Sequence, residues 1–306
     1  MPQPGAVAVV RAEAVSKRWG RTLALDGASF EIGKGITGLL GANGAGKTTL
    51  LGLSLGLTHP DGGSLEVLGL DPVAAGPDVR AIVGYSPEHQ SLPPEVQAYD
   101  LVAHLAEIHG LPHRAAQTRA SDALYQVGLG EERFRPVGTM STGQRQRVKL
   151  AAALAHDPSL ILLDEPTDGL DPVQRDDMLT LIRRVGTEFG INVLLSSHLL
   201  DEVDRVCDSA VILVDGRVAA AGPLDELRTG VGGWYVEVEA GTEQLAAALR
   251  RAGVSVIPDG RRILVEGIDS ASVVRDMVAT LGLALVRLER RRLTLEDVFL
   301  EAGVYG

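Results

Sequence analysis

The stretch GANGAGKT, residues 41–48, lies between a strand-like run, ITGLL, and a helical run, TLLGLSLGL. This order of strand, glycine-rich loop and helix is typical of a phosphate-binding loop, because glycines allow backbone amides to approach phosphate oxygens. Lys47 would neutralise β- and γ-phosphate oxygens, and Thr48 would be a ligand of Mg²⁺. The alternative, a glycine-rich turn beside a surface lysine, does not account for the flanking strand and helix. The residues predicted to bind nucleotide here are Gly41, Ala42, Asn43, Gly44, Ala45, Gly46, Lys47, Thr48 and Thr49.

Two acids follow a second strand-like run, LILLDEP, residues 160–166. Carboxylates at a buried sheet edge cost free energy unless they have a partner, and a metal ion supplies one. We therefore expect Asp164 to hold Mg²⁺ through its water shell. Glu165 is expected to accept a proton from, or to orient, the water that attacks the γ-phosphate. The alternative, two solvated acids at a strand end, is weakened by the phosphate loop in the same chain.

The stretch MSTGQRQR, residues 140–147, is predicted to begin a second helix of functional interest. Small polar residues occupy positions 141–143, where a helix cap belongs, and apolar residues follow at helical spacing. The unpaired amides of the first turn and the helix dipole favour a phosphate or a carboxylate. Because the phosphate loop already surrounds the nucleotide from one side, we expect this helix start to serve a nucleotide held by another copy.

Together these motifs resemble the ATP-binding cassette ATPases over residues 7 to about 221. MSTGQ is similar to that family's signature, usually LSGGQ, and GANGAGKT and LILLDEP match its two nucleotide motifs in order and spacing. DGLD, residues 168–171, is similar to its D-loop, and SSH, ending in His198, to its switch histidine. In this family two cassettes pair head to tail, and each signature contacts the nucleotide in the other's phosphate loop. The resemblance implies ATP as the nucleotide and a second cassette, identical or paralogous, as a partner.

The resemblance also implies roles for individual residues. Trp19 lies where the family places an aromatic ring that stacks on adenine, and an indole offers a π face for that contact. His198 would hydrogen-bond to the γ-phosphate and the attacking water, so that Glu165 and His198 are the expected catalytic residues. A structural tryptophan and a structural histidine are the alternatives. The expected shared-site residues are Ser141, Gly143, Gln144 and Asp168.

Two positions depart from the family pattern. Thr142 replaces the first glycine of the signature, and its β-branched side chain is expected to weaken or adjust closure of the pair. In VGYSPEHQ, Glu88 takes the place of the family's Mg²⁺-sensing glutamine, and Gln90 follows two residues later. The alignment of GYSP favours Glu88 over Gln90, and a carboxylate can still ligate Mg²⁺. The predicted metal ligands are therefore Thr48, Glu88 and Asp164.

The order of strand and helix signals predicts the fold class. Up to about residue 221, strand-like runs alternate with helices, which indicates an α/β cassette of the P-loop NTPase kind with a mainly parallel sheet. Strand signals stop between about residues 93 and 150, which predicts a helical subdomain. After the linker-like RTGVGG, residues 231–306 are expected to form a small ferredoxin-like α+β domain of order βαββαβ, followed by a last helix, LTLEDVFLEAG. The predicted domains are thus 1–230 and 231–306.

Composition narrows the class of protein further. The 306 residues are 45% hydrophobic and carry a formal net charge of −11, which argues against nonspecific nucleic-acid binding. The single cysteine, Cys207, cannot form an internal disulfide, and the N-terminus lacks a secretory pattern, so a cytoplasmic location is expected. The apolar runs are strand-sized, so any membrane role must involve a partner.

The resemblance implies an ATPase subunit that drives separate transmembrane permease subunits from the cytoplasmic face of the membrane. The C-terminal module and LTLEDVFLEAG resemble the extension of ABC-2 type cassettes, most of which serve exporters. One alternative is a soluble cassette ATPase acting on ribosomes or DNA, although those relatives usually carry two cassettes or a long coiled coil. Another is a catalytically silent nucleotide-binding subunit, against which Glu165 and His198 argue.

Overall fold

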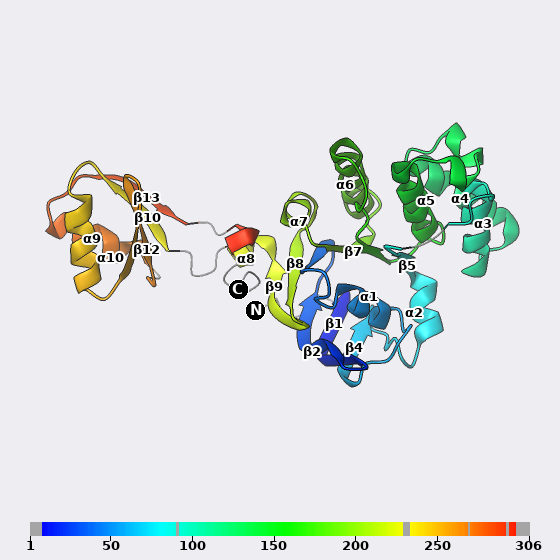
Figure 1. Cartoon of the computed structure of the whole chain (residues 1–306), viewed down its shortest axis with the longest axis horizontal. Coiled ribbons are helices and arrows are strands. Elements are labelled where there is room, and N and C mark those ends of the chain that lie inside the picture. Colours follow the sequence, from blue (N-terminus) through cyan, green and yellow to red (C-terminus); the bar gives the residue numbers. More distant parts are fainter. Residues whose placement is uncertain (1–7, 90–91, 229–232, 269, 292–293, 298–306) are drawn as a thin grey trace. The chain divides into compact units, whose positions relative to one another are not determined.

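The computed structural model describes residues 8–89, 92–228, 233–268, 270–291 and 294–297. Contacts within the chain divide it between Leu224 and Asp225 into two compact units (Figure 1). The boundary predicted from the sequence, at residues 230 and 231, lies outside the described residues, as does most of the linker-like RTGVGG. Each unit has its own apolar core and is described by itself.

A six-stranded sheet forms the centre of the first unit. Its order is β5-β6-β7-β3-β8-β9, and every neighbouring pair is parallel except β8 and β9. The strands β3 and β6 are buried along their whole length, which explains why they consist of continuous apolar runs. The bounds are β3 (Ile36–Leu40), β5 (Val83–Ser86), β6 (Leu160–Asp164), β7 (Asn192–Ser197), β8 (Ser209–Val214) and β9 (Arg217–Pro223).

The antiparallel strand β9 comes from a run that the sequence presents as one strand-like segment, SAVILVDGRVAAAG. The structure folds this run into a hairpin at Asp215 and Gly216, which both have positive φ angles, 48° and 79°. Asp and Gly tolerate this left-handed backbone, which suits the tight turns of hairpins. The predicted mainly parallel sheet therefore has an antiparallel edge.

A separate three-stranded antiparallel sheet lies beside the central one, with the order β2-β1-β4. Its strands are β1 (Val10–Trp19), β2 (Thr22–Ile32) and β4 (Gly62–Val67). Val10 and Ala12 of β1 face the core in alternation, and Val15 is buried after an irregularity that shifts the register. This sheet brings Trp19, at the end of β1, to the neighbourhood of the phosphate loop.

Helices complete the first unit. The sheet is accompanied by α1 (Lys47–Ser54), α2 (Gly76–Ile82), α6 (Pro172–Thr187) and α7 (Leu200–Val206). The short helix α8 (Leu224–Arg228) begins at the boundary between the two units. The predicted helical subdomain contains α3 (Ala98–Ile108), α4 (His113–Gln126) and α5 (Thr142–Leu154), with short 3-10 turns at Glu131–Phe134 and Val137–Thr139. In Figure 1, α3, α4 and α5 form a group apart from β1, β2 and β4. Small buried alanines on these helices allow close packing.

The second unit has the predicted element order. It runs β10 (Trp234–Val238), α9 (Thr242–Arg251), β11 (Ser255–Asp259), β12 (Arg262–Glu266), α10 (Ala271–Thr280) and β13 (Leu285–Arg290). The antiparallel sheet has the order β11-β12-β10-β13, which is the ferredoxin-like arrangement. Leu245, Leu249 and Val274 of the two helices pack on the sheet residues Val236 and Ile263. The predicted fold class is therefore confirmed.

The predicted last helix is seen only at its start. Residues 295–297 are helical, and Thr294 Oγ1 accepts a hydrogen bond from Asp297 N at 3.1 Å. The Asp297 carboxylate accepts one from Thr294 N at 2.8 Å, which completes a reciprocal cap. The rest of LTLEDVFLEAG lies outside the described residues.

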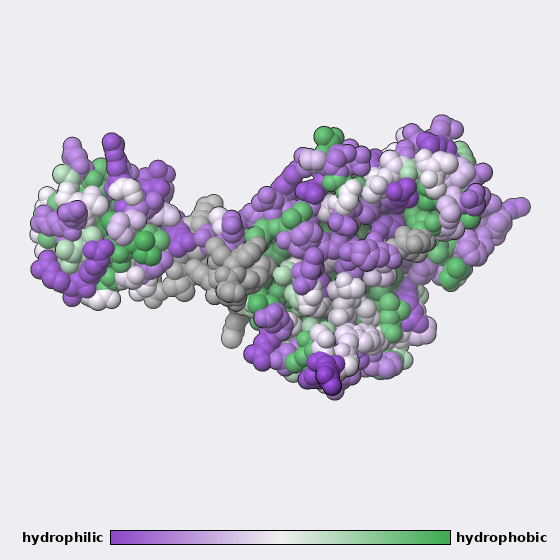
Figure 2. All heavy atoms as spheres, viewed as in Figure 1, coloured by the Kyte–Doolittle hydropathy of each residue, from purple (hydrophilic) through white to green (hydrophobic). Residues whose placement is uncertain are grey.

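The surface drawn in Figure 2 is largely hydrophilic, with hydrophobic residues in separate small groups. Within the described part of the chain, no helix combines the length and the apolar character needed to cross a bilayer.

Candidate functional site

The phosphate loop joins β3 to α1, as predicted. Gly44 and Gly46 have φ angles of 85° and 105°, a backbone that side chains with a Cβ rarely adopt. A Cβ at Gly46 would also collide with the carbonyl oxygen of Ala24, whereas one at Gly44 would meet open space. Gly46 caps α1 without a side-chain hydrogen bond, so the first-turn amides are left to a ligand.

Lys47 is buried at the base of this loop, with 6% of its surface exposed. Its Nζ donates a hydrogen bond to Gly41 O at 2.6 Å and lies 3.0 Å from Glu165 Oε1. A buried ammonium requires such partners, since an unpaired charge in the interior is costly. The lysine therefore stands between the loop backbone and the acid predicted to act in catalysis.

A pocket of about 330 Å³ opens over the loop. Glu88 and Glu165 line it together with Ala24 and the loop, so the two acids share a cavity with the predicted phosphate-binding residues. The lining residues are Ala24, Ala42, Asn43, Gly44, Gly46, Lys47, Thr48, Thr49, Glu88 and Glu165. Gln90, the alternative to Glu88, lies outside the described residues. Ala24 was not predicted, because its contribution comes from a strand distant in sequence.

Asp164 is the last residue of β6, Glu165 follows it, and both are buried. Ser196 of the neighbouring strand β7 joins them, because its Oγ donates to Asp164 Oδ1 at 2.6 Å and accepts from Glu165 N at 3.0 Å. The second oxygen, Asp164 Oδ2, is buried with no hydrogen-bond partner. An orphaned carboxylate oxygen beside a phosphate loop fits a hard cation such as Mg²⁺. Among the described residues, no group of three or more His, Cys, Asp and Glu side chains could hold a metal ion.

Glu165 connects the loop to the switch histidine. His198 Nδ1 lies 2.9 Å from Glu165 Oε2, while the other carboxylate oxygen faces Lys47. Glu165 also has a positive φ angle of 45°, an uncommon backbone for a residue with a side chain. The strand β6, the loop and β7 thus converge on one carboxylate.

Glu202 is a further buried acid that the sequence analysis did not identify. Its carboxylate accepts hydrogen bonds from Thr167 Oγ1 at 2.7 Å and Ser197 Oγ at 2.6 Å. These contacts tie α7 to the segment after β6 and to the last residue of β7. A glutamate inside an amphipathic helical run gives little sequence signal for such a role.

Trp19 is 52% exposed, as expected for a ring that contacts a ligand rather than the core. Its Nε1 donates to Thr49 Oγ1 at 3.3 Å, which holds the indole beside α1, and Lys17 Nζ lies 5.0 Å from the ring centroid. The ring is therefore placed next to the phosphate loop, although it does not line the pocket described above.

The predicted signature begins α5 with a reciprocal cap. Gln144 N donates to Ser141 Oγ at 3.2 Å, and Ser141 N donates to Gln144 Oε1 at 3.1 Å. A Cβ at Gly143 would lie 2.6 Å from the side-chain oxygen of Gln174, so a larger residue there would displace this flexible side chain. Asp168 is tied to the same helix through its carbonyl oxygen, which accepts from Gln146 Nε2 at 3.3 Å. Residues 141–144 and Asp168 are absent from the lining of the chain's own phosphate pocket.

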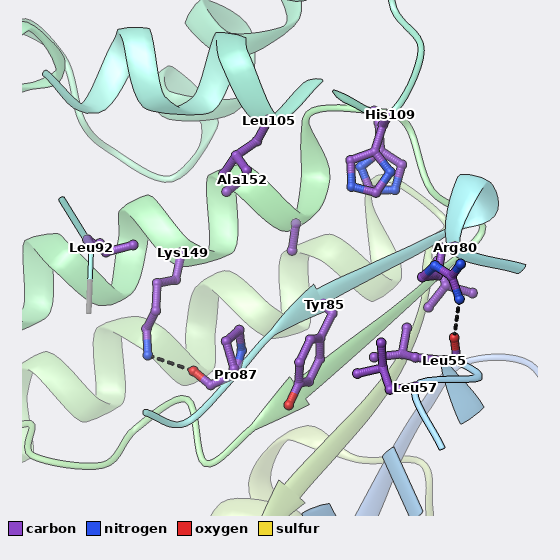
Figure 3. A pocket seen from close by; sticks show the side chains of 13 residues that line it. Leu55, Leu57, Arg80, Tyr85, Pro87, Leu92, Leu105, His109, Lys149 and Ala152 are labelled. Atoms are coloured by element: carbon purple, nitrogen blue, oxygen red, sulfur yellow. Dashed lines mark hydrogen bonds between the residues drawn. The ribbon is translucent and has the colours of Figure 1, made fainter. Parts of the chain in front are cut away.

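A second, mainly apolar pocket of about 250 Å³ lies between the helical subdomain and β5 (Figure 3). Leu57, Tyr85, Leu105 and Lys149 are among the residues that line it. Lys149 Nζ donates to Pro87 O at 2.9 Å and to Glu88 O at 3.1 Å. Burial, with the charges of Asp164 and Glu88, raises the pKa of Tyr85 to about 12. This pocket therefore shares the segment after β5 with the phosphate pocket.

The rings of His109 and His156 stack at one end of this apolar pocket, with centroids 3.8 Å apart and planes inclined by 7°. Burial and the neighbouring His109 lower the pKa of His156 from 6.5 to about 4. The pair is therefore held in its neutral form at pH 7.

The parallel sheet, the glycine loop with its lysine and the two acids after β6 define a nucleotide-binding ATPase. Residues 25–168 match the family model described as ABC transporter. The chain belongs to the ATP-binding subunits of ABC transporters, and the resemblance stated from its sequence is confirmed.

Several relatives match almost the whole chain. The daunorubicin resistance ATP-binding protein DrrA3 of Streptomyces coeruleorubidus is 36% identical over 301 residues, which are 95% of this chain and 94% of the relative. The Nod factor export ATP-binding protein I of Ralstonia nicotianae is 32% identical over 305 residues, 98% of this chain and 95% of that protein. Among solved structures, cbiO1 of Clostridium perfringens, part of the cbiONQ complex, has a TM-score of 0.65 at 26% identity, covering 80% of this chain and 97% of its own.

Proposed function

We propose that this chain is the ATPase subunit of an ABC-2 type exporter, and that it works as one of a pair of cassettes sharing two molecules of Mg·ATP. The names of the relatives support export, since one is a drug-resistance protein and another a Nod factor export protein. Both likenesses extend over the second unit as well as the cassette. The exported substrate would be recognised by separate membrane subunits, with this chain peripherally bound at the cytoplasmic face.

One observation carries the proposal of a shared site. The phosphate pocket is lined by the loop and by the acids Glu88 and Glu165, but by none of residues 141–144 at the start of α5. That helix start nevertheless presents a capped first turn suited to an anion. A second cassette, turned head to tail, would bring this turn to the γ-phosphate.

Within each pocket the residues have complementary tasks. The loop amides and Lys47 would bind the phosphates, and Trp19 would stack on the adenine. Mg²⁺, held by Thr48, Asp164 and Glu88, would neutralise charge on the phosphate oxygens. Glu165 would hold or accept a proton of the attacking water. His198 Nδ1 is hydrogen-bonded to Glu165 Oε2.

The apolar pocket of Figure 3 is proposed to receive the membrane subunits. It lies between the helical subdomain and β5, and its wall includes Pro87 next to Glu88. Lys149 spans from this pocket to the carbonyl oxygen of Glu88. Movement of a membrane-subunit segment docked in this pocket would therefore shift Lys149. Because Lys149 is hydrogen-bonded to the backbone of Glu88, the movement would be transmitted to this predicted Mg²⁺ ligand.

Affinity purification of the tagged full chain from detergent-solubilised membranes of its own host tests this function. The expected result is recovery with an integral membrane protein of about six apolar spans, and ATP turnover by the complex. Glu165→Gln in the same preparation should abolish turnover while leaving the complex intact. Recovery with ribosomes or DNA, or nucleotide binding without turnover by the wild type, would overturn the proposal in favour of one of its alternatives.

A further inference from the structure

The buried acid Glu202 of α7 is held in one place by groups from three other segments of the chain. Only 2% of the residue is exposed, and each of its carboxylate oxygens accepts a hydrogen bond from a hydroxyl. Thr167 Oγ1 donates to Oε1 at 2.7 Å, and Ser197 Oγ donates to Oε2 at 2.6 Å. Arg175 Nε of α6 lies 3.4 Å from Oε1, so a cation compensates the carboxylate charge. Since a buried carboxylate is costly without such partners, this side chain has little freedom to move.

The Ser197 hydroxyl fixes the backbone around the switch histidine. Besides donating to Glu202, its Oγ accepts a hydrogen bond from Leu199 N at 3.0 Å, which closes a turn around His198. Serine hydroxyls that accept from the amide two residues later stabilise turns of this kind. The side chain of His198 is 41% exposed, so neighbouring side chains enclose the ring only in part. The direction of the ring therefore depends on this turn and on the contact with Glu165.

The Thr167 hydroxyl fixes a second turn, which follows β6. In this turn Asp168 N donates to Glu165 O at 3.1 Å, and Thr167 lies between the two residues. Glu165 begins the turn with a φ angle of 45°, a backbone that is unfavourable for a residue with a side chain. Such a conformation persists only when the surrounding structure holds it. The hydrogen bond from Thr167 to Glu202 provides one such restraint.

The two turns also meet directly, because His198 Nδ1 lies 2.9 Å from Glu165 Oε2. Glu202 thus completes a closed ring of contacts, in which it joins the turn after β6 to the turn after β7 on the side away from the Glu165–His198 contact. Glu202 does not line the phosphate pocket itself. Any influence that it has on bound nucleotide therefore passes through the residues that it holds.

We infer that Glu202 is a positioning residue for ATP hydrolysis, because it sets the placement of His198 relative to Glu165. This inference rests on the proposed function, in which both residues act on the attacking water. The two turns follow separate strands, and Glu202 fixes one against the other. Loss of its carboxylate would let His198 move away from Glu165, while every group that binds phosphate or Mg²⁺ would remain. The effect therefore belongs to kcat and not to KM.

The test measures ATP turnover by the full chain in the complex recovered from its host. Glu202→Ala should lower kcat by about tenfold to a hundredfold, as expected when a catalytic group is misplaced by about 1 Å. The KM for ATP and the Mg²⁺ concentration for half-maximal rate should each stay within about twofold. Glu202→Gln, whose amide can hydrogen-bond to both hydroxyls, should recover most of the turnover. Asp201→Ala is the matched control, because it removes the neighbouring, exposed acid of the same helix, and it should leave kcat unchanged.

A double-mutant cycle with His198→Ala tests whether Glu202 acts through the histidine. In single-turnover measurements, Glu202→Ala should lower the rate in the wild-type background and change it by less than about twofold in the His198→Ala background. Thr167→Val keeps the shape of the side chain but removes one hydroxyl, so it is the milder variant if Glu202→Ala folds poorly. It should show the same non-additivity. The melting temperature and the stoichiometry of ATP-analogue binding give the folded fraction.

The outcomes separate this inference from the proposed function. If Glu165→Gln or His198→Ala leaves turnover unchanged, the catalytic roles in the proposed function fail. If both lower turnover, but the folded Glu202→Ala and Thr167→Val proteins work at the wild-type rate, only the role of Glu202 is refuted. Losses that are additive with His198→Ala, or that appear in KM, would also refute it and assign Glu202 to the stability of the cassette.

Discussion

Lys47 Nζ lies 3.0 Å from Glu165 Oε1, and the side chains are only 6% and 8% exposed. The cation of the phosphate loop and the predicted catalytic acid therefore form one buried ion pair. Glu165 is held on its other oxygen by His198. Because the two charges compensate each other where water is largely excluded, Lys47 and Glu165 affect the stability of the fold as well as catalysis.

Lys47→Ala is expected to lose nucleotide affinity and to destabilise the cassette by about 3 kcal/mol, because it leaves the Glu165 carboxylate buried beside an unfilled space. Nucleotide titration and chemical unfolding measure the two effects. The double variant with Lys47→Ala and Glu165→Gln should recover part of the lost stability but none of the lost nucleotide affinity. A Lys47→Ala protein with wild-type affinity would contradict the role of the loop.

Glu165→Gln should retain ATP and trap the pair closed, because the neutral amide keeps the shape but cannot accept a proton. Turnover is expected to fall by about a hundredfold or more. Phosphate release and sedimentation provide the two measurements. Unchanged turnover would remove Glu165 from catalysis.

Ser141→Arg should block closure without abolishing nucleotide binding by the open monomer, because a long cation would fill the helix start. When the Ser141→Arg and Lys47→Ala proteins are mixed, a dimer of one of each should contain one working site. That site combines the intact phosphate loop of the Ser141→Arg protein with the intact signature of the Lys47→Ala protein. Partial ATPase activity of the mixture, absent from either protein alone, is the expected result. A mixture as inactive as its components, with both folded, would contradict the shared site.

Ser196→Ala should lower turnover and raise the Mg²⁺ concentration needed for half-maximal rate, because Asp164 and Glu165 lose the hydroxyl that joins them. Ser197→Ala is the matched control on the same strand, since Ser197 contacts Glu202 instead. Equal Mg²⁺ requirements in the wild type and Ser196→Ala would show that this hydroxyl does not position the acids.

His156→Phe should change how stability depends on pH. The folded pKa of His156, about 4, is below the unfolded value of 6.5, so unfolding binds a proton between these values. Its contribution is present above pH 6.5 and is lost as pH falls towards 4, by roughly 3 kcal/mol in all. Phenylalanine keeps a ring against His109 without this loss. Urea unfolding at several pH values should therefore give curves that diverge below pH 6.5, and parallel curves would refute the assignment.

The parts of the site predicted from sequence share one property, which is that their signals are local. The phosphate loop, the acids after β6 and the capped start of α5 each depend on a few adjacent residues in a fixed order. Glu88 was predicted in the same way, and the structure brings it to the loop. Ser196 and Glu202 were missed, because a serine in a strand or a glutamate in a helix acquires its role only from a distant partner.

The amino-acid sequence alone determined the chemical groups, the order of the elements and the βαββαβ pattern of the second unit, because periodicity and loop composition act over neighbouring residues. Only the tertiary structure decided which of these groups are in contact. It brings Lys47 to Glu165, Ser196 to Asp164 and Glu165, and Arg145 to the hydroxyl of Thr142. Parallel strands that are far apart along the chain place their carboxyl ends side by side, and no local pattern specifies the resulting contacts.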